Sequence, residues 1–274
     1  MSVQIIDGKK IAAEIRGEIK KEITELGITP GLAVILVGAD PASHLYVGLK
    51  EKAAAEVGIH FEKFLFFATE PEEKIIVKIQ ELNARSDIHG IIVQLPLPEN
   101  YDENKIIAAI DAGKDADGFH PENIKKFLSG APEIIPPVIS GILKLIESTG
   151  VELKNKKITI LANSEILAKP LKKILEGNEV KIIITPEILT TEITDADIVI
   201  SALGRAKIIT ADAIKPGAIL IDVGTTRLDD GKTVGDIDFE STATKAGFIT
   251  PVPGGVGPMT VAELLRNVLR LTKK

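Results

Sequence analysis

Residues 36–58 read LVGADPASHLYVGLKEKAAAEVG, and this stretch decides the fold of the first half of the chain. It is entered through an apolar run at 32–37, as expected for a fully buried strand of a parallel sheet. Asp40 is a suitable N-cap residue, and Pro41 suits the first position of a helix, where no N–H is needed. Gly58 suits the end of that helix. The stretch therefore predicts a strand, a capped turn and a helix.

Tyr46 and Lys50 are four residues apart on the predicted helix and so share one of its faces. Ligands of open α/β sheets gather at the carboxyl ends of strands, where this helix begins. A lysine held there beside a phenol can have a shifted pKa and can transfer protons. This segment alone is equally compatible with a lysine–tyrosine pair on the surface that has no function.

Two later segments favour the functional interpretation. Residues 89–100 read HGIIVQLPLPEN, in which Gln94 closes an apolar strand and needs a hydrogen-bonding partner if it is buried. Residues 114–121 read KDADGFHP, where two aspartates before a glycine indicate a tight polar loop. Taken one at a time, each segment could also be an ordinary turn with its polar groups satisfied.

The composition is that of a globular protein and excludes several classes of function. A length of 274 residues predicts about two domains. The net charge of −6 argues against a nucleic-acid surface, and the absence of cysteine excludes disulfides and thiolate chemistry. The four histidines are scattered without zinc-ligand spacing, so we predict no metal. We find no signal peptide and no apolar stretch that could span a membrane, and we expect a cytoplasmic protein.

The proline-rich segment APEIIPPV at 131–138 separates two halves that both alternate strands and helices. In the first half we predict strands at 32–37, 61–67 and 90–95 and helices at 9–26, 41–57, 71–84 and 102–111. In the second half we predict a helix at 139–149, strands at 157–162, 179–184, 197–202 and 218–223, and a last helix at 260–272. The predicted fold class is α/β, with a doubly wound parallel sheet in the second half.

Five motifs resemble the family of bifunctional methylenetetrahydrofolate dehydrogenase/methenyltetrahydrofolate cyclohydrolase. They are DPASHLYVGLKEKA at 40–53, GIIVQLPLP at 90–98, KDADGFHP at 114–121, VGDIDF at 234–239 and PGGVGPMT at 253–260. The resemblance implies a folate-binding catalytic domain at 1–137, completed by the C-terminal helix at 260–274. It also implies a Rossmann-like NAD(P)-binding domain at 138–259, with the active site in the cleft between the two domains.

The same resemblance implies two reactions and a role for several residues. 5,10-Methylenetetrahydrofolate would be oxidised to 5,10-methenyltetrahydrofolate with NAD(P)⁺, and the product hydrolysed to 10-formyltetrahydrofolate. Lys50 would be the central proton-transferring group, with Tyr46 packed against it and Gln94 hydrogen-bonded to it. Asp117 would hold the pterin ring, whereas Asp115 would cap its loop. The implied substrate-binding residues are Tyr46, Gln94, Leu95, Pro96, Asp117, Pro253, Gly254 and Gly255.

The implied dinucleotide site departs from the family pattern. Relatives have Gly-Arg-Ser-x-Ile-Val-Gly-x-Pro after the first strand of the second half, but residues 162–170 here read ANSEILAKP. The glycines that allow close approach of a phosphate are replaced by alanine, and the arginine that clamps the 2′-phosphate of NADP by asparagine. Thr185 stands where relatives have a second polar element. The implied cofactor-binding residues are Ala162, Asn163, Ser164, Thr185 and Thr225.

Several alternatives follow from this departure. The protein could use NAD instead of NADP, the family's usual cofactor, or could still bind NADP through Ser164, Lys169 or Arg205. It could also be a cyclohydrolase with a weak or lost dehydrogenase activity, or a folate-binding relative without catalysis. Family members are usually homodimers, so we expect a homodimer whose partners are small molecules, not nucleic acid or membrane.

Overall fold

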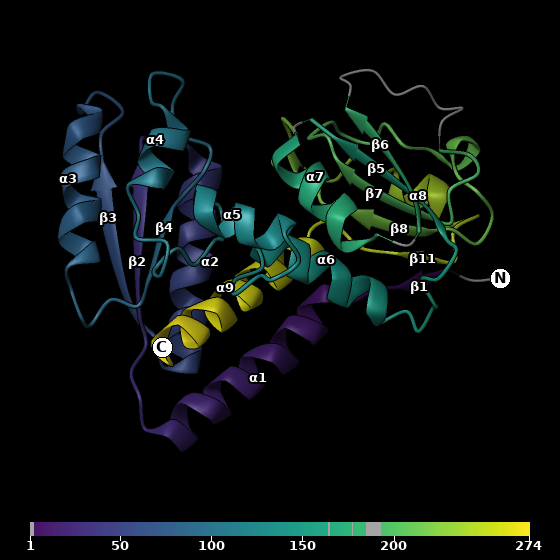
Figure 1. Ribbon diagram of the computed structural model, residues 1–274. Helices are drawn as coiled ribbons and strands as arrows, with labels where there is room; N and C mark the ends of the chain where they lie inside the picture. The colour runs from purple at the N-terminus through teal and green to yellow at the C-terminus, as the bar shows by residue number, and fades with distance from the viewer. Residues whose placement is uncertain (1–2, 164, 177, 185–192) are drawn as a thin grey trace. The chain divides into compact units, whose positions relative to one another are not determined.

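The computed structural model describes residues 3–163, 165–176, 178–184 and 193–274. The contacts within the chain divide it into two compact units, each built around a parallel sheet (Figure 1). Unit 1 contains Val138–Thr260 together with the start of the chain up to Ala12, and unit 2 contains Ala13–Pro137 together with Val261–Lys274. Each unit therefore includes one short piece from the opposite end of the chain.

The sheet of unit 2 has the strand order β3-β2-β4, and both pairs are parallel. The central strand β2 (Gly31–Val37) is buried at every position, which explains its uninterrupted apolar sequence. It pairs with β3 (His60–Phe66) at the edge and with β4 (Gly90–Val93) on its other side. The predicted strand at 90–95 ends two residues early, and the Leu95–Pro96 peptide bond that follows it is cis.

The helices of unit 2 cover this sheet. Alternate residues of β2 and β4 pack with the apolar face of α3 in one core cluster, as the pattern of Ile75, Ile79 and Leu82 predicts. The helices are α1 (Gly8–Leu26), α2 (Pro41–Val57), α3 (Glu72–Asn83), α4 (Glu103–Ala108), α5 (Pro121–Leu128) and α9 (Val256–Thr272), of which α1 and α9 begin in unit 1.

The caps predicted for α2 are confirmed. Asp40 Oδ2 accepts a hydrogen bond from the Ser43 N–H at 2.7 Å, and Pro41 occupies the first turn. Gly58 ends the helix with φ 89°, a left-handed conformation that glycine adopts without steric cost. The same signals at α5, with His120 as N-cap and Pro121 after it, were not used in the sequence analysis, which has no helix there.

The sheet of unit 1 has the order β1-β11-β8-β7-β5-β6, six strands among the described residues, and all neighbouring pairs are parallel. The four predicted strands correspond to β5 (Lys157–Ala162), β6 (Glu179–Ile184), β7 (Ile198–Ala202) and β8 (Ile219–Asp222). The structure adds β1 (Gln4–Ile5) and β11 (Phe248–Ile249), which extend the sheet beside β8. Strands of two residues carry no detectable alternation, so the sequence pattern did not predict them.

The remaining elements of unit 1 flank this sheet. They are α6 (Pro137–Glu147), α7 (Glu165–Ile174), the 3₁₀-helix η2 (Ala211–Ala213), α8 (Phe239–Thr242) and the hairpin of β9 (Thr226–Arg227) and β10 (Thr233–Val234). Pro170 lies inside α7, beyond the first turn, which is the part of a helix where proline is best tolerated.

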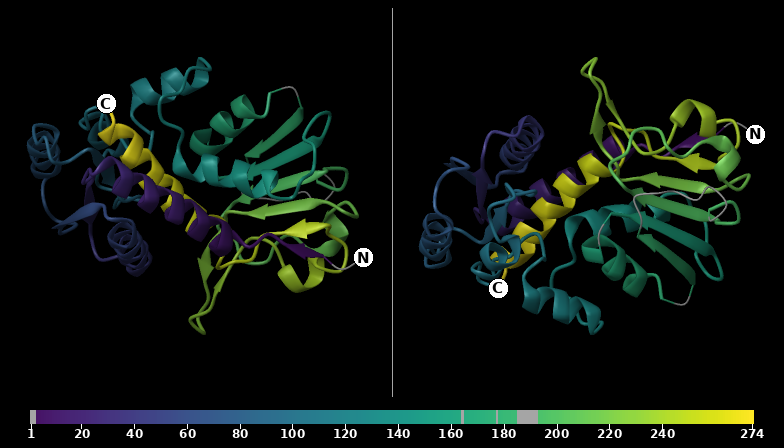
Figure 2. Two further views of the ribbon diagram at one scale, coloured as in Figure 1. Left: turned by 90° about the horizontal axis from the view of Figure 1, so that it is seen from below. Right: turned by 90° about the horizontal axis from the view of Figure 1, so that it is seen from above.

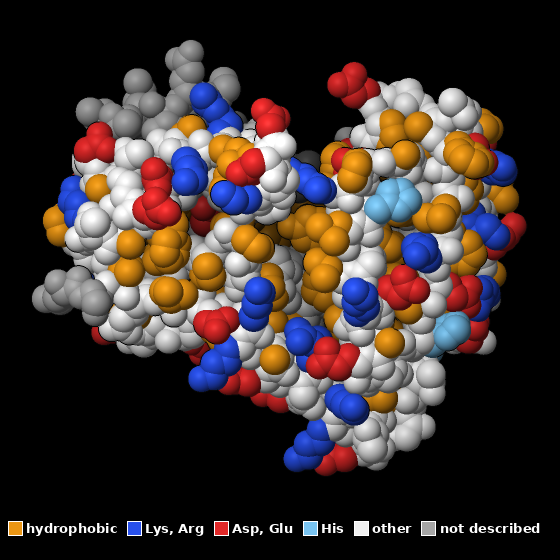
Figure 3. All heavy atoms as spheres, turned by 180° about the vertical axis from the view of Figure 1, so that it is seen from behind, with side chains coloured by type: hydrophobic (Ala, Val, Ile, Leu, Met, Phe, Trp, Pro, Cys, Tyr) orange, Lys and Arg blue, Asp and Glu red, His pale blue; other side chains and the backbone are white. Residues whose placement is uncertain are grey.

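Helices α1 and α9 come from opposite ends of the chain and run side by side (Figure 2). Within unit 2, Arg266 Nη2 donates to Glu18 Oε2 at 2.6 Å, and Lys273 is paired with Glu22. Among the described residues, no helix has the length and apolarity needed to cross a lipid bilayer. On the face of the molecule shown in Figure 3, acidic and basic side chains are interspersed.

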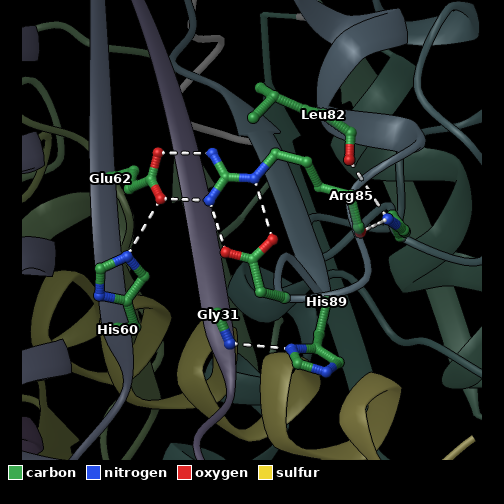
Figure 4. A network of polar contacts seen from close by, with 8 residues as sticks. Gly31, His60, Glu62, Leu82, Arg85 and His89 are labelled. Carbon is green, nitrogen blue, oxygen red and sulfur yellow. Dashed lines mark hydrogen bonds and ion pairs between the residues drawn. The ribbon is translucent and has the colours of Figure 1, made fainter.

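A polar network joins the edge strand β3 to the segment between α3 and β4 (Figure 4). The guanidinium of Arg85 donates two hydrogen bonds to Glu62, at 2.6 and 2.8 Å, and two to Asp87, at 2.6 and 2.9 Å. Arg85 thereby holds the pKa of Asp87 down, to about 2. Nearby, the N–H of Gly31 donates to His89 Nδ1 at 3.0 Å, which fixes the start of β2 against the start of β4.

The close approach at Gly31 generates a test of this packing. A Cβ at Gly31 would lie 2.0 Å from the backbone oxygen of Asp87, whereas a Cβ at Gly17, within α1, would meet nothing within 4 Å. We expect Gly31→Ala to lower the free energy of unfolding by about 3 kcal/mol, because the backbone must shift. We expect Gly17→Ala, the matched control in the same unit, to raise it by about 1 kcal/mol through helix propensity. Urea unfolding followed by circular dichroism measures both, and equal effects would contradict the packing described.

Candidate functional site

Lys50 lies on α2 with only 8% of its surface exposed, and its ammonium nitrogen has a specific partner. Lys50 Nζ donates to Gln94 Oε1 at 2.9 Å, which confirms the predicted hydrogen bond between these residues. Gln94 is itself fixed, because its backbone N–H donates to Ile35 O at 2.8 Å and its Nε2 donates to Leu95 O at 2.6 Å. The amide oxygen is therefore held toward the lysine, at the carboxyl end of the sheet of unit 2.

Asp117 shares its electrostatic environment with this lysine. Burial lowers the pKa of Lys50, and the carboxylate of Asp117 raises it in part. Burial also raises the pKa of Asp117 to about 6; Lys50 lowers that pKa, while Asp115 raises it. Asp117 keeps some exposed surface, but protein atoms surround it closely enough for this desolvation. Desolvation thus disfavours the charged form of both groups, lowering the pKa of the Lys50 amine and raising that of the Asp117 carboxyl.

Asp115 holds the loop that carries Asp117, as predicted. Asp115 is 1% exposed, and its carboxylate accepts hydrogen bonds from the N–H groups of Gly118 at 3.0 Å and His120 at 2.8 Å. The N–H of Ile91, in β4, donates to Lys114 O at 2.7 Å, which attaches the loop to the edge of the sheet. Asp115 and Asp117 therefore have different roles, because the carboxylate of Asp115 already accepts hydrogen bonds from the backbone of its own loop.

The predicted substrate-binding residues fall in both units. Tyr46 is half-buried one helical turn before Lys50, and Leu95 and the exposed Pro96 follow Gln94 directly. In unit 1, the segment 253–255 leads into α9; the Val252–Pro253 bond is cis and Gly254 has φ 123°. A Cβ on the third residue of this segment would lie 2.7 Å from Thr250 Cβ, so only glycine fits there. The role of these residues in binding stays a prediction.

The predicted cofactor residues that the structure describes lie at the carboxyl edge of the sheet of unit 1. Ala162 is buried at the end of β5, and the exposed Asn163 donates its N–H to Ala202 O at 3.3 Å. Thr225 is exposed in the turn after β8. This edge is where dinucleotides bind in doubly wound sheets. Ser164 and Thr185 lie outside the described residues.

A pair of buried carboxylates beside this edge was missed in the sequence analysis, although the motif that contains Asp236 was noted. Asp236 accepts hydrogen bonds from Ser201 Oγ and from the N–H groups of Leu203 and Arg205, all at 2.7–2.8 Å. Asp236 thereby shapes the loop that follows β7. Asp222 accepts from three further backbone N–H groups, and burial raises its pKa to about 7. The sequence feature that could have indicated the pair is an aspartate close to a glycine in each segment: Asp222 with Gly224, and Asp236 with Gly235.

Glycines make room for these carboxylates. A Cβ at Gly224 would lie 2.1 Å from Asp236 Oδ1, and a Cβ at Gly235 would lie 1.9 Å from Asp222 Oδ2. Each carboxylate therefore occupies the space of a missing side chain on the other segment. Among the described residues, no group of three or more His, Cys, Asp or Glu side chains could hold a metal ion.

Comparison with known proteins covers the whole chain. Residues 6–117 match the family model for the tetrahydrofolate dehydrogenase/cyclohydrolase catalytic domain, and residues 136–274 match the model for the NAD(P)-binding domain of the same enzymes. The bifunctional protein FolD of Moorella thermoacetica is 46% identical over 280 residues, covering 100% of both chains.

Solved structures agree with these matches. The bifunctional enzyme FolD of Campylobacter jejuni superposes with a TM-score of 0.92 at 38% identity, covering 99% of each chain. The FolD enzyme of Trypanosoma brucei, solved with NADP and an inhibitor, superposes with a TM-score of 0.95 at 33% identity, covering 100% of this chain and 98% of its own. By its two domains, its fold and its full-length relatives, this chain belongs to the tetrahydrofolate dehydrogenase/cyclohydrolase family.

Proposed function

We propose that this protein oxidises 5,10-methylenetetrahydrofolate to 5,10-methenyltetrahydrofolate with NAD(P)⁺ and hydrolyses the product to 10-formyltetrahydrofolate. The observation that carries the proposal is the buried Lys50, hydrogen-bonded to Gln94 and electrostatically coupled to Asp117. The family membership and the two matched domains supply the substrate and the cofactor class. A purely folate-binding role would not require a lysine whose pKa is lowered by burial.

The first reaction forms a cation, and the state of Lys50 suits it. The methylene carbon between two folate nitrogens loses hydride with its electron pair, and a nitrogen lone pair completes the C=N⁺ bond of the methenyl bridge. When bound, the oxidised nicotinamide accepts this hydride. An uncharged amine at Lys50 does not repel the cationic product, and burial favours the uncharged form. Asp117 would hold the pterin ring by accepting hydrogen bonds from its N–H donors.

The second reaction needs a group that both takes and gives a proton. Water adds to the methenyl carbon and loses one proton, which gives a neutral carbinolamine. The C–N bond then breaks, the departing nitrogen gains a proton, and the carbinol hydroxyl loses its proton to solvent as the formyl C=O forms, so that one proton is released overall. In this proposal Lys50 takes the first proton as a general base and gives a proton to the departing nitrogen as a general acid. Its bond from Nζ to the fixed amide oxygen of Gln94 keeps the amine in one orientation through both steps.

The strand–turn–helix unit of β5 and α7 fits a dinucleotide, because the N-terminus of a helix attracts a pyrophosphate. The charges of the side chains at the start of α7 favour NAD over NADP. Asn163 is uncharged, and Lys169 is paired with Glu165 within the first two turns of α7. An acidic side chain there disfavours a 2′-phosphate. We therefore propose that NAD serves at least as well as NADP. The homodimer and the cytoplasmic location stay predictions.

We expect Lys50→Gln to lower the rate of methenyltetrahydrofolate hydrolysis by about 10²–10⁴-fold, the usual contribution of a general acid–base group. The dehydrogenase should keep part of its activity, because hydride transfer itself needs no proton from Lys50. Absorbance assays of the two reactions separate these effects. The exposed Lys52→Gln on the same helix is the control and should change neither rate. Normal hydrolysis in Lys50→Gln would exclude this role for the lysine.

The pKa of Asp117 predicts a pH dependence. Its carboxylate accepts from the pterin ring when ionised, so kcat/KM of the dehydrogenase for the folate should fall as the pH drops through about 6. The loss lies on the acid side because protonation removes the acceptor charge. Steady-state rates between pH 5 and 8 measure this limb. Asp117→Asn cannot titrate and should lack the limb; if the variant retained it, the assignment to Asp117 would be wrong.

The cofactor proposal is tested by kcat/KM for NAD and NADP in parallel. We expect Asn163→Arg to raise kcat/KM for NADP by about 10–100-fold, the effect of one hydrogen-bonded charge pair. Its kcat/KM for NAD should change little. Asn178→Arg, at a half-buried site after α7, is a control for added charge in the same unit. A wild-type enzyme that strongly prefers NADP would refute the proposal.

A further inference from the structure

The backbone just before Asp117 is held by a side chain from the far end of the chain. Asn267, on α9, is 2% exposed, and its Nδ2 donates to two backbone oxygens. One is Ala116 O at 3.0 Å, and the other is Ile135 O at 2.9 Å. An asparagine amide has two N–H donors, and both are therefore in use.

A second buried asparagine holds the same loop at its other end. Asn123, on α5, is 4% exposed; its Nδ2 donates to Ala112 O and to Asp115 Oδ2, both at 2.9 Å. The loop is thus attached to α5 by one amide and to α9 by the other. Within the described residues, no hydrogen bond fixes the Asp117 carboxylate itself, so its position depends on the backbone that carries it and on its charge interaction with Lys50.

We propose that Asn267 is a positioning residue for the folate site, which acts through the carbonyl of Ala116 on the placement of Asp117. The proposal rests on the proposed function, in which Asp117 binds the pterin ring. Removal of the two N–H donors leaves the buried carbonyl of Ala116 and the part-buried carbonyl of Ile135 without these bonds, and the loop regains a partner for Ala116 O only by moving. The carboxylate of Asp117 then moves with it, away from the place set by the intact loop.

A role limited to stability makes a different prediction. Loss of the two hydrogen bonds would then lower the unfolding temperature and leave the affinity of the folded protein for its substrate unchanged. The half-buried Asn83 offers a comparison in the same unit. Its Nδ2 donates to Ala109 O and its Oδ1 accepts from the Asp111 N–H, both at 2.9 Å, and neither bond involves Ala116.

The test compares Asn267→Leu with the control Asn83→Leu in the dehydrogenase assay. We expect Asn267→Leu to raise KM for the folate by about tenfold, with kcat within about threefold of wild type and KM for the dinucleotide unchanged. Asn267→Ser keeps one donor and should lie between wild type and Asn267→Leu. Asn83→Leu should lose stability without this rise in KM. If Asn267→Leu does not fold, the rise in the folate KM of Asn267→Ser tests the proposal.

A double-mutant cycle with Asp117→Asn separates the possible failures. If Asn267 acts through Asp117, the double variant should have the folate KM of Asp117→Asn alone. The carboxylate whose position Asn267 controls is then already absent. Additive effects, or a folate KM unchanged in both Asn267 variants, would overturn the proposal. An unchanged KM in Asp117→Asn itself would instead overturn the proposed role of Asp117 in binding the pterin ring.

Discussion

The hydrogen bond between Lys50 and Gln94 is the interaction on which the catalytic unit depends. A lysine that is 8% exposed must lose its charge or find partners, because an isolated buried ammonium is very costly. The strand β2 leads into the helix that carries Lys50, and Gln94 directly follows β4, so two adjacent strands bring the two side chains to one place. Asp117 adds a carboxyl whose own charge is weakened by burial. The result is a buried amine beside an amide and a carboxyl, a set of groups that can exchange protons.

Unit 1 also buries ionisable side chains, but it stabilises them mainly with backbone N–H groups. Asp222 and Asp236 are buried close together, and backbone N–H groups supply most of their hydrogen bonds. Gly224 and Gly235 leave the space that the carboxylates occupy. The pair orders the turns after β7 and β8, at the edge where a doubly wound sheet binds its dinucleotide. The polar interior of this unit therefore serves to shape loops, whereas that of unit 2 includes groups that can react.

The sequence predicts those features whose signals are local. The caps Asp40 and Gly58 and the long apolar strands agree with the structure, since each depends on residues within a few positions of one another. The short strands β1 and β11 were missed because two residues contain no periodicity. The contact of Asn267 with Ala116 was missed for another reason: it spans 151 positions, and a buried asparagine on a helix does not indicate its partner. The Lys50–Gln94 bond, 44 positions apart, was predicted only through the family resemblance.

The exchange of short end pieces between the two units has a consequence for the order of folding. During synthesis, β1 is made first but must wait for β11, its neighbour in the sheet of unit 1. The segment that completes unit 2, beginning at Val261, is made after all of unit 1. A ribosome-bound chain therefore carries most of the catalytic unit for a long time without Asn267, the residue that ties down the Asp117 loop. Domains that fold during translation usually do so in order from the N-terminus. Here unit 2, most of which is made before most of unit 1, is completed last.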